Sequence, residues 1–323
     1  MKSVLTDTPL SALPQPKLWA LGEPTVLRLE DLKRPEGYSL DGEHTHAMTL
    51  SAGGFEATGY GEGIGDLAEK RAYSEAIERL ALLEYCNRTG STESSNGWAA
   101  HLTADQAVEA AIFELIERDV ALATWESGGV FHLVPEFLWP AAIQTWKSSR
   151  QRRYEFHDLK IFLSANSNGA SISALLFNER GNFVSGHGSA RTMEKAILSA
   201  THECLRAAHS ALRFAHFHET KLLHGKGNSE YPFEPGAHSL AYAYSETMPS
   251  EVRVDLISGQ DALSLWRRHQ LSYEELSLSD FAIDLTRAGS RIVARVKNSK
   301  YRKIFWGPCQ DDSKPNKRPH FVG

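Results

Sequence analysis

Apolar positions recur at helical spacing in four long segments of the chain and alternate at strand spacing in several shorter ones. We expect helices over 66–87, 104–123, 192–218 and 260–270. We expect strands over 47–51, 159–165, 171–177, 182–188, 240–244, 281–286 and 291–296. Because helices and strands alternate irregularly, the sequence predicts an α+β fold of mixed sheets and long packed helices rather than a doubly wound sheet.

The first 45 residues differ from the rest in being weakly periodic and rich in proline, with Pro9, Pro14, Pro16, Pro24 and Pro35. This pattern is typical of an arm rather than of a packed domain. We therefore predict an N-terminal arm over 1–45 and one domain over 46–323, which ends in a short proline-containing tail.

Six glycines fall within the thirteen residues from Gly53 to Gly65, just before the first long helix. They predict a loop with sharp turns and close backbone approach. The two common phosphate-binding glycine motifs do not fit this spacing. A glycine loop that opens onto a helix N-terminus can still present N–H groups to an anion, although an ordinary strand–turn–helix corner would have the same sequence.

A short pattern occurs twice, as Glu75-Ala-Ile-Glu78-Arg79 and as Glu114-Leu-Ile-Glu117-Arg118. Each copy points two carboxylates the same way from one helix face, in continuation of a face of small alanines. Four carboxylates on two helices suit a hard cation, which in enzymes often accompanies phosphates. The alternative is a set of salt bridges on solvated helix faces.

His202, His209 and His216 recur every seven residues on the third long helix, which also carries Glu203 and Arg206. A zinc site is conceivable there. Residues seven apart are two helical turns apart, however, which is too far for the three imidazoles to share one ion.

Composition excludes several classes of function. The net charge is -5 with no basic stripe, so nucleic acid is not an expected partner. The cysteines Cys86, Cys204 and Cys309 form no disulfide framework, which indicates a reducing compartment. No signal-peptide pattern or membrane-spanning apolar run is visible, so we expect a cytoplasmic protein without a membrane partner.

Four segments, in order, resemble the signatures of the YcaO-domain family. The first is Gly59-Tyr-Gly-Glu-Gly63 with Glu75 to Arg79, and the second is Ser95-Asn-Gly-Trp-Ala-Ala100 with Glu114 to Asp119. The third is Gly186-His-Gly-Ser-Ala190 with Ala196 and Glu203, and the fourth is Phe281 to Thr286 with Ile292 to Val296. Each is weak alone, whereas together they are specific.

The resemblance implies the family's own ATP-binding fold, with ATP and Mg²⁺ as cofactors. Family members phosphorylate a backbone amide oxygen of a peptide after a nucleophile has attacked the carbonyl. In azoline-forming members the nucleophile is a Cys, Ser or Thr side chain of a ribosomal peptide. Other members make thioamides or macrocyclic amidines.

The resemblance also assigns roles to residues of this chain. Glu75, Glu78, Glu114 and Glu117 match the magnesium ligands, and Arg118 and Arg295 match phosphate-contacting arginines. Asn96 and the glycine segment with Gly61 and Gly63 match the lining of the nucleotide pocket. Arg71 and Gln106 occupy positions of that site where the family usually has a serine and a glutamate.

The chain departs from the family pattern at other positions as well. Glu62 stands where many members have a lysine, and the tail Arg318-Pro-His-Phe-Val-Gly323 keeps only traces of a proline-rich ending. We hypothesise that His320 or the terminal carboxylate of Gly323 supplies a proton acceptor near the substrate. A thioamide- or amidine-forming enzyme, or a catalytically silent ATP-binding scaffold subunit, remains an alternative.

The expected partners follow from the resemblance and the length of the arm. A leader-peptide-binding domain does not fit in 1–45, so a partner protein of the ThiF-like (ubiquitin-activating-enzyme-like) kind is expected to recruit the precursor peptide. A dehydrogenase partner and a homodimer are further expectations.

Overall fold

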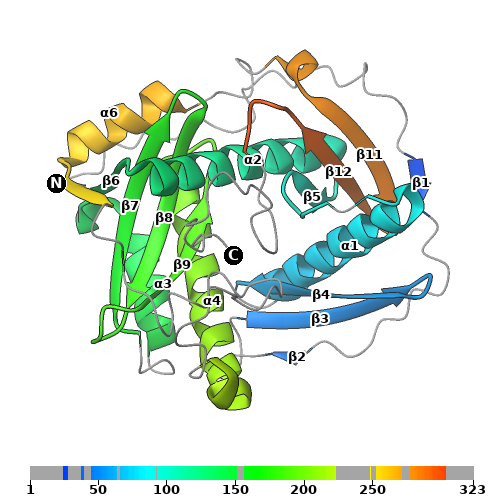
Figure 1. The fold of residues 1–323 in the computed structure, drawn as a ribbon, viewed down its shortest axis with the longest axis horizontal. Coiled ribbons are helices and arrows are strands. Elements are labelled where there is room, and N and C mark those ends of the chain that lie inside the picture. The colour runs from blue at the N-terminus through cyan, green and yellow to red at the C-terminus, as the bar shows by residue number, and fades with distance from the viewer. Residues whose placement is uncertain are drawn as a thin grey trace.

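Three β-sheets and the helices between them make up the fold (Figure 1). The structure is a computed structural model that describes residues 25–27, 38–39, 45–63, 66–91, 93–150, 156–222, 248, 252–270 and 277–302. The predicted class, α+β with mixed sheets and long packed helices, is confirmed.

Each sheet has a different strand order. The small sheet has the order β2-β3-β4, with β2 (Tyr38–Ser39), β3 (Thr45–Ala52) and β4 (Phe55–Glu62). The four-stranded sheet has the order β1-β11-β12-β5, with β1 (Thr25–Leu27), β11 (Ala282–Ala288), β12 (Arg291–Lys297) and β5 (Trp98–His101). The five-stranded sheet has the order β10-β6-β7-β8-β9, with β10 (Arg253–Leu256), β6 (Val130–Leu133), β7 (Asp158–Asn166), β8 (Gly169–Phe177) and β9 (Phe183–Gly188). β1 pairs parallel with β11 and β10 with β6, whereas the other described pairs are antiparallel. Thus β4, β5 and β9 each end the order of one sheet.

The long helices fill the spaces between the sheets. Helix α1 (Asp66–Thr89) packs Ala72, Ile77 and Leu80 between the small and the four-stranded sheets. Helix α2 (Ala104–Ser127) packs between the four-stranded and the five-stranded sheets. Helices α3 (Pro140–Arg150), α4 (Met193–Leu222) and α6 (Gly259–His269) cover the other face of the five-stranded sheet. Two short 3₁₀ helices, η3 (Glu136–Leu138) and η4 (Leu278–Asp280), complete the described elements.

Two described segments of the predicted N-terminal arm are strands of these sheets. β1 extends the four-stranded sheet beside β11, and β2 pairs with β3. The division between 1–45 and 46–323 stays a prediction. The strand predicted at 240–244 and the tail after Arg302 lie outside the described residues. None of the described helices is both long enough and apolar enough to cross a membrane.

Most predicted elements are confirmed, but the glycine loop is wrong. Residues 55–62 form β4, which pairs with β3 over its whole length, and the turn is confined to Gly53 and Gly54. Gly59 and Gly61 therefore belong to a strand. The run of glycines predicts a loop, but the glycines of β4 are present because helix α1 packs too closely for a side chain.

The glycines of β4 let the backbone of α1 approach the strand. A Cβ on Gly61 would lie 1.9 Å from the carbonyl oxygen of Ala68, and a Cβ on Gly59 would lie 2.1 Å from that of Ala72. Both contacts are with helix backbone, which cannot move aside as a flexible side chain could. Alanines on α1 and glycines on β4 thus fix the distance between strand and helix.

This packing predicts that Gly61→Ala lowers the free energy of unfolding by about 2–3 kcal/mol, because β4 must move away from α1. Gly90→Ala is the control, since the space around Gly90 is open and its φ of +65° makes the cost backbone strain alone, about 1 kcal/mol. Urea unfolding measures both. An equal or smaller loss for Gly61→Ala would contradict the packing argument.

Candidate functional site

The four glutamates predicted from the duplicated pattern come from the facing helices α1 and α2. Glu75 and Glu78 lie on α1, and Glu114 and Glu117 lie on α2. The carboxylates of the two helices lie close enough to interact, and the charge of Glu78 contributes to the raised pKa of Glu114. Burial is the largest cause of that raised pKa.

Three further carboxylate and guanidinium groups join this cluster. Helix α4 contributes Glu203 and Arg206, and β4 contributes Glu62. Arg206 lies 3.5 Å from a carboxylate oxygen of Glu75 and 3.6 Å from one of Glu62. The sequence patterns do not assign these three residues a role in the site, although Glu203 lies in the third family-like segment.

Arg118 lies among the carboxylates of α2 and α4. Its guanidinium is 3.3 Å from Glu117 and 3.5 Å from Glu203, with Glu114 at 4.0 Å. Arg118 is therefore the link between the second copy of the pattern and helix α4. The structure thus brings together five predicted site residues: Glu75, Glu78, Glu114, Glu117 and Arg118.

Backbone amides of the edge strands hold four of these carboxylates in place. The amide of Tyr60 in β4 donates to Glu75 at 2.7 Å, and that of His187 in β9 donates to Glu203 at 2.5 Å. Glu78 accepts from the amide of Ala100 in β5, and Glu117 accepts from the amide of Ser189, just after β9. Each amide belongs to, or directly follows, the last strand of a sheet, where N–H groups lack a neighbouring strand.

Burial strongly affects the protonation of the cluster. Desolvation raises the pKa of Glu78 to about 8, with a further contribution from the charge of Glu75. Desolvation also raises the pKa of Glu117 to about 8, assisted by Glu203 and opposed by Arg118. Burial alone would raise the pKa of Glu203 too, but Arg118 and Arg206 outweigh it and lower that pKa.

The donor set fits a hard divalent cation. The carboxylates of Glu62, Glu75, Glu78, Glu114, Glu117 and Glu203 outnumber the guanidinium groups of Arg79, Arg118 and Arg206, and oxygen is the donor that Mg²⁺ prefers. The raised pKa values of Glu78 and Glu117 show that burying their negative charge is costly here. Within the described ranges, no three carboxylate, imidazole or thiol groups already lie together as a ready metal site. The magnesium-ligand roles of the glutamates stay predictions.

Asn96 lies at the turn before β5 and contacts the end of the described chain. Its side-chain amide donates to the carbonyl oxygen of Arg302 at 3.2 Å, while its buried Oδ1 accepts no hydrogen bond from the described residues. The amide of Arg302 in turn donates to Asp119 at 3.0 Å. Asp119 also accepts from Asn166 and Asn168, so one buried carboxylate fixes a β-turn and residue 302 together.

Arg71 is an exposed residue on α1 that turns back to β4. Its guanidinium donates to the carbonyl oxygen of Glu62 at 2.7 Å and contacts Nδ1 of His202 on α4 at 3.5 Å. Arg71 thus bridges the strand that carries Glu62 and the helix that carries Glu203.

Arg295 makes its hydrogen bonds to carboxylates outside the cluster of α1, α2 and α4. On β12 it makes two hydrogen bonds with Glu93, at 2.9 and 2.7 Å, and one with Asp284. Its guanidinium also stacks over the ring of Tyr85, 4.1 Å from the centroid, near the end of α1. The predicted contact of Arg295 with phosphate stays a prediction.

The remaining predicted site residues are a glutamine, two glycines and two positions of the tail. Gln106 is exposed in the first turn of α2, where its backbone N–H donates to the capping hydroxyl of Thr103 at 3.3 Å. Gly63 follows β4 with a φ of +146°, and Gly61 is buried against α1. The two predicted catalytic positions, His320 and Gly323, lie outside the described residues.

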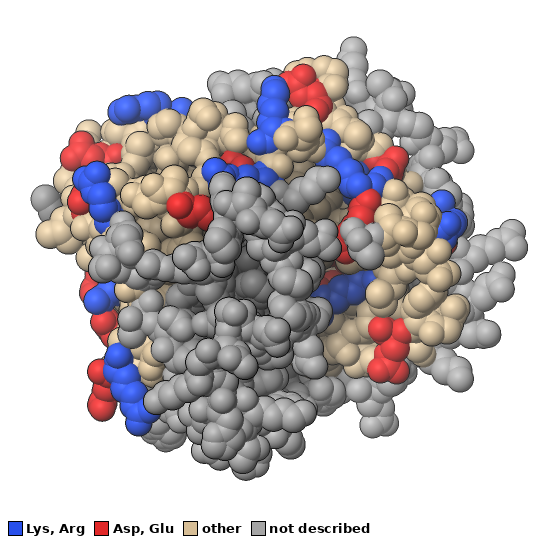
Figure 2. Space-filling view, in the orientation of Figure 1, with Lys and Arg blue, Asp and Glu red and all other residues tan. Residues whose placement is uncertain are grey.

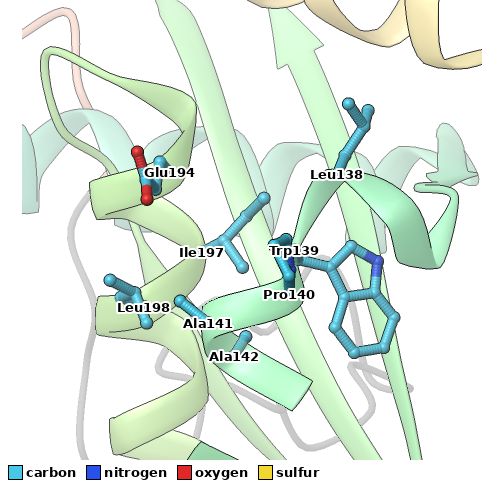
Figure 3. Close-up of a pocket in the computed structure, with 8 residues that line it drawn as sticks. All are labelled: Leu138, Trp139, Pro140, Ala141, Ala142, Glu194, Ile197 and Leu198. Carbon is cyan, nitrogen blue, oxygen red and sulfur yellow. The ribbon is translucent and has the colours of Figure 1, made fainter. Parts of the chain in front are cut away.

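Two surface features are weaker candidates for a functional site than this cluster. A small pocket between α3 and α4 is lined mainly by apolar side chains such as Trp139 and Ile197, with Glu194 as its one charged lining residue (Figure 3). On the face shown in Figure 2, acidic and basic side chains of the described residues are interspersed rather than gathered by sign.

The fold resembles that of several solved structures. YcaO from Methanopyrus kandleri, bound with AMPPCP and Mg²⁺, is 15% identical with a TM-score of 0.51, and the match covers 82% of this chain and 84% of that one. A heterocyclase in complex with substrate and cofactor is 13% identical with a TM-score of 0.52, over 80% of this chain and 48% of that one. A chain of the E. coli microcin synthetase McbBCD complex is 12% identical with a TM-score of 0.47, over 84% and 88%. No curated protein matches the sequence significantly.

The family model of the YcaO cyclodehydratases, described as ATP- and Mg²⁺-binding, matches residues 78–302. The match begins at Glu78, so β4 and Glu75 precede it, and it includes Glu114, Glu117 and Arg118. The predicted fold and the predicted cofactors, ATP and Mg²⁺, are confirmed at the level of the family. The chain belongs to the YcaO family.

Proposed function

We propose that this chain uses ATP to activate backbone amides of a ribosomal peptide, giving azoline rings at Cys, Ser or Thr residues. The observation that carries the proposal is the buried glutamate–arginine cluster between α1, α2 and α4. The family's ATP- and Mg²⁺-binding description supports it, because the cluster supplies both oxygen donors for a cation and guanidinium groups for phosphates.

The proposed reaction replaces a poor leaving group with a good one. The thiol or hydroxyl of the substrate attacks the preceding carbonyl carbon and loses its proton, and the carbonyl oxygen takes the γ-phosphoryl group of ATP. The C–O bond then breaks, the amide nitrogen loses its proton to form the C=N bond, and ADP and phosphate are released. The protein's part is mostly positioning and neutralisation of charge.

The residues of the cluster divide this work. Glu75, Glu78, Glu114 and Glu117 would hold Mg²⁺, which when bound neutralises phosphate charge and orients the nucleotide. Arg118 would contact phosphate oxygens from its place between Glu117 and Glu203. The edge-strand amides of Tyr60 and Ala100 fix the carboxylates of α1 in advance, which lowers the reorganisation needed on binding.

The proposal includes partners and a place in the cell. A precursor peptide is the substrate, and a ThiF-like leader-binding protein recruits it. A dehydrogenase acts on the azolines, the chain forms a homodimer, and the complex works in the cytoplasm. The McbBCD protein is by name part of a complex. For this chain, partner proteins are proposed from its membership of the family.

The first test removes one charge from each copy of the duplicated pattern. Glu75→Gln and Glu117→Gln should each lower product formation by roughly 100-fold or more, about 2.7 kcal/mol in activation free energy, because each removes an anionic metal ligand. Glu84→Gln is the matched control, since Glu84 lies on the same helix as Glu75 and pairs only with Arg88 among the described residues. Mass spectrometry of a co-expressed precursor peptide measures the product.

The same spectra distinguish the reaction class. A loss of about 18 Da per site means cyclodehydration, and a gain of about 16 Da means thioamide formation. Unchanged modification in both glutamine variants would show that this chain does not catalyse the reaction and would favour the scaffold alternative.

The tail is tested separately from the nucleotide site. We expect removal of residues 319–323 to abolish product formation while leaving ATP affinity within about twofold, because the segment with His320 and Gly323 is proposed to accept a proton from the substrate. His320→Asn tests the imidazole alone. Turnover at the full-length rate after the removal would refute a role for the tail.

The pKa values of about 8 for Glu78 and Glu117 predict how stability without metal depends on pH. The folded chain retains protons that an unfolded chain releases near pH 4.5, so stability without metal falls as pH rises from 4.5 to 8. Glu78→Gln should reduce this fall by about 1 kcal/mol or more between pH 6 and 8, the equivalent of one pKa unit. Urea unfolding in chelator measures it, Glu84→Gln is the control, and an unchanged fall in Glu78→Gln would contradict the prediction.

A further inference from the structure

The unit of β9 and α4 is built like the unit of β4 and α1. Each strand carries two glycines separated by one residue, and in each strand these glycines pack against the backbone of the following helix. A Cβ on Gly186 would lie 2.1 Å from the amide nitrogen of Cys204, and one on Gly188 would lie 2.2 Å from the carbonyl oxygen of Ala196. These values equal those for Gly59 and Gly61 within a few tenths of an ångström.

The residue between the two glycines has the same role in both units. Tyr60 donates its amide to Glu75 of α1, and His187 donates its amide to Glu203 of α4. Glu203 is therefore the counterpart of Glu75. Three residues later, α1 carries Glu78 whereas α4 carries Arg206. Where the first unit presents a second carboxylate, the second unit presents a cation.

The surroundings of Arg206 differ from those of an arginine in a closed ion pair. Its nitrogens lie 3.5 Å from Glu75, 3.5 Å from Glu203 and 3.6 Å from Glu62. A charge-assisted hydrogen bond is shorter, roughly 2.7–2.9 Å. The side chain is 27% exposed, compared with 11% for Arg118. The guanidinium thus lies between three carboxylates and keeps an accessible surface.

Arg295 shows the contrasting case on the same chain. Its bonds to Glu93, at 2.9 and 2.7 Å, have the lengths of direct hydrogen bonds, and its side chain is 13% exposed. A phosphate would have to displace Glu93 before it reached Arg295. It would meet Arg206 without breaking a short bond to any of the three described carboxylates.

We propose that Arg206 is a further phosphate-binding residue of the nucleotide site. The inference rests on the proposed function for the presence of ATP. A divalent cation among the carboxylates would supply the positive charge that Arg206 now gives them, and the planar guanidinium would then turn its N–H groups to polyphosphate oxygens. Glu203, held by the amide of His187, keeps Arg206 and Arg118 side by side.

The experiment compares the affinities of the full chain for a non-hydrolysable ATP analogue with Mg²⁺ and for adenosine. We expect Arg206→Gln to weaken binding of the analogue roughly 10- to 100-fold, the loss of a charged hydrogen bond, and to leave adenosine binding within about twofold. Arg206→Lys should retain part of the affinity, because the charge remains and the fork is lost. Arg88→Gln, an exposed arginine of α1 paired with Glu84, is the control.

The alternative role makes the opposite prediction. An arginine that only neutralises carboxylates competes with Mg²⁺ for them, so Arg206→Gln would then tighten binding of the analogue at limiting Mg²⁺. Tighter or unchanged binding would overturn the inference, as would equal losses for the analogue and for adenosine. If the wild-type chain binds the analogue and Arg206→Gln loses it, but no peptide is modified, the proposed function fails and this inference stands.

Discussion

Hydrogen bonds from edge-strand amides to helix carboxylates connect the three sheets of this protein. Helix α1 carries two of them, from Tyr60 of β4 to Glu75 and from Ala100 of β5 to Glu78, and so joins two separate sheets through one helical turn. The amide after β9 adds the third sheet through Glu117 on α2. An amide that donates to a charged acceptor makes a stronger bond than a neutral pair does. The positions of the helices relative to the sheets therefore depend on the ionisable groups of the site.

That arrangement concentrates negative charge in a place that water reaches poorly. Burial raises the pKa of Glu78 and Glu117, whereas Arg118 and Arg206 lower the pKa of Glu203. The cluster is thus electrostatically unbalanced without a ligand, and a cation that binds only the folded chain stabilises it by mass action. Buried charge destabilises an ordinary core, but it is useful where magnesium and phosphate are to be bound.

The sequence was sufficient for the parts of the fold and site that depend on local pattern. Helical spacing located α1, α2 and α4, and the duplicated Glu-x-x-Glu-Arg located the cluster. It failed where the reason for a residue lies in another element. Gly59 and Gly61 suggest a loop by composition, yet they are strand glycines because Ala68 and Ala72 lie against them. Arg206 and Glu62 gave no local signal, since their meeting requires α4 to return to β4. A comparison of Gly59-Tyr-Gly61 with Gly186-His-Gly188 could have found Glu203, because a glutamate follows both at nearly the same distance.

The bonded edge amides also bear on how substitutions in the site affect the fold. A buried N–H group without an acceptor is costly, so each carboxylate that accepts from β4, β5 or β9 satisfies a backbone group as well as supplying an oxygen donor to the site. Folding and chemistry consequently depend on the same atoms. A change from glutamate to alanine would leave an amide without its acceptor as well as remove a ligand, whereas glutamine would keep an oxygen to accept the amide, so the two changes differ in their cost to stability.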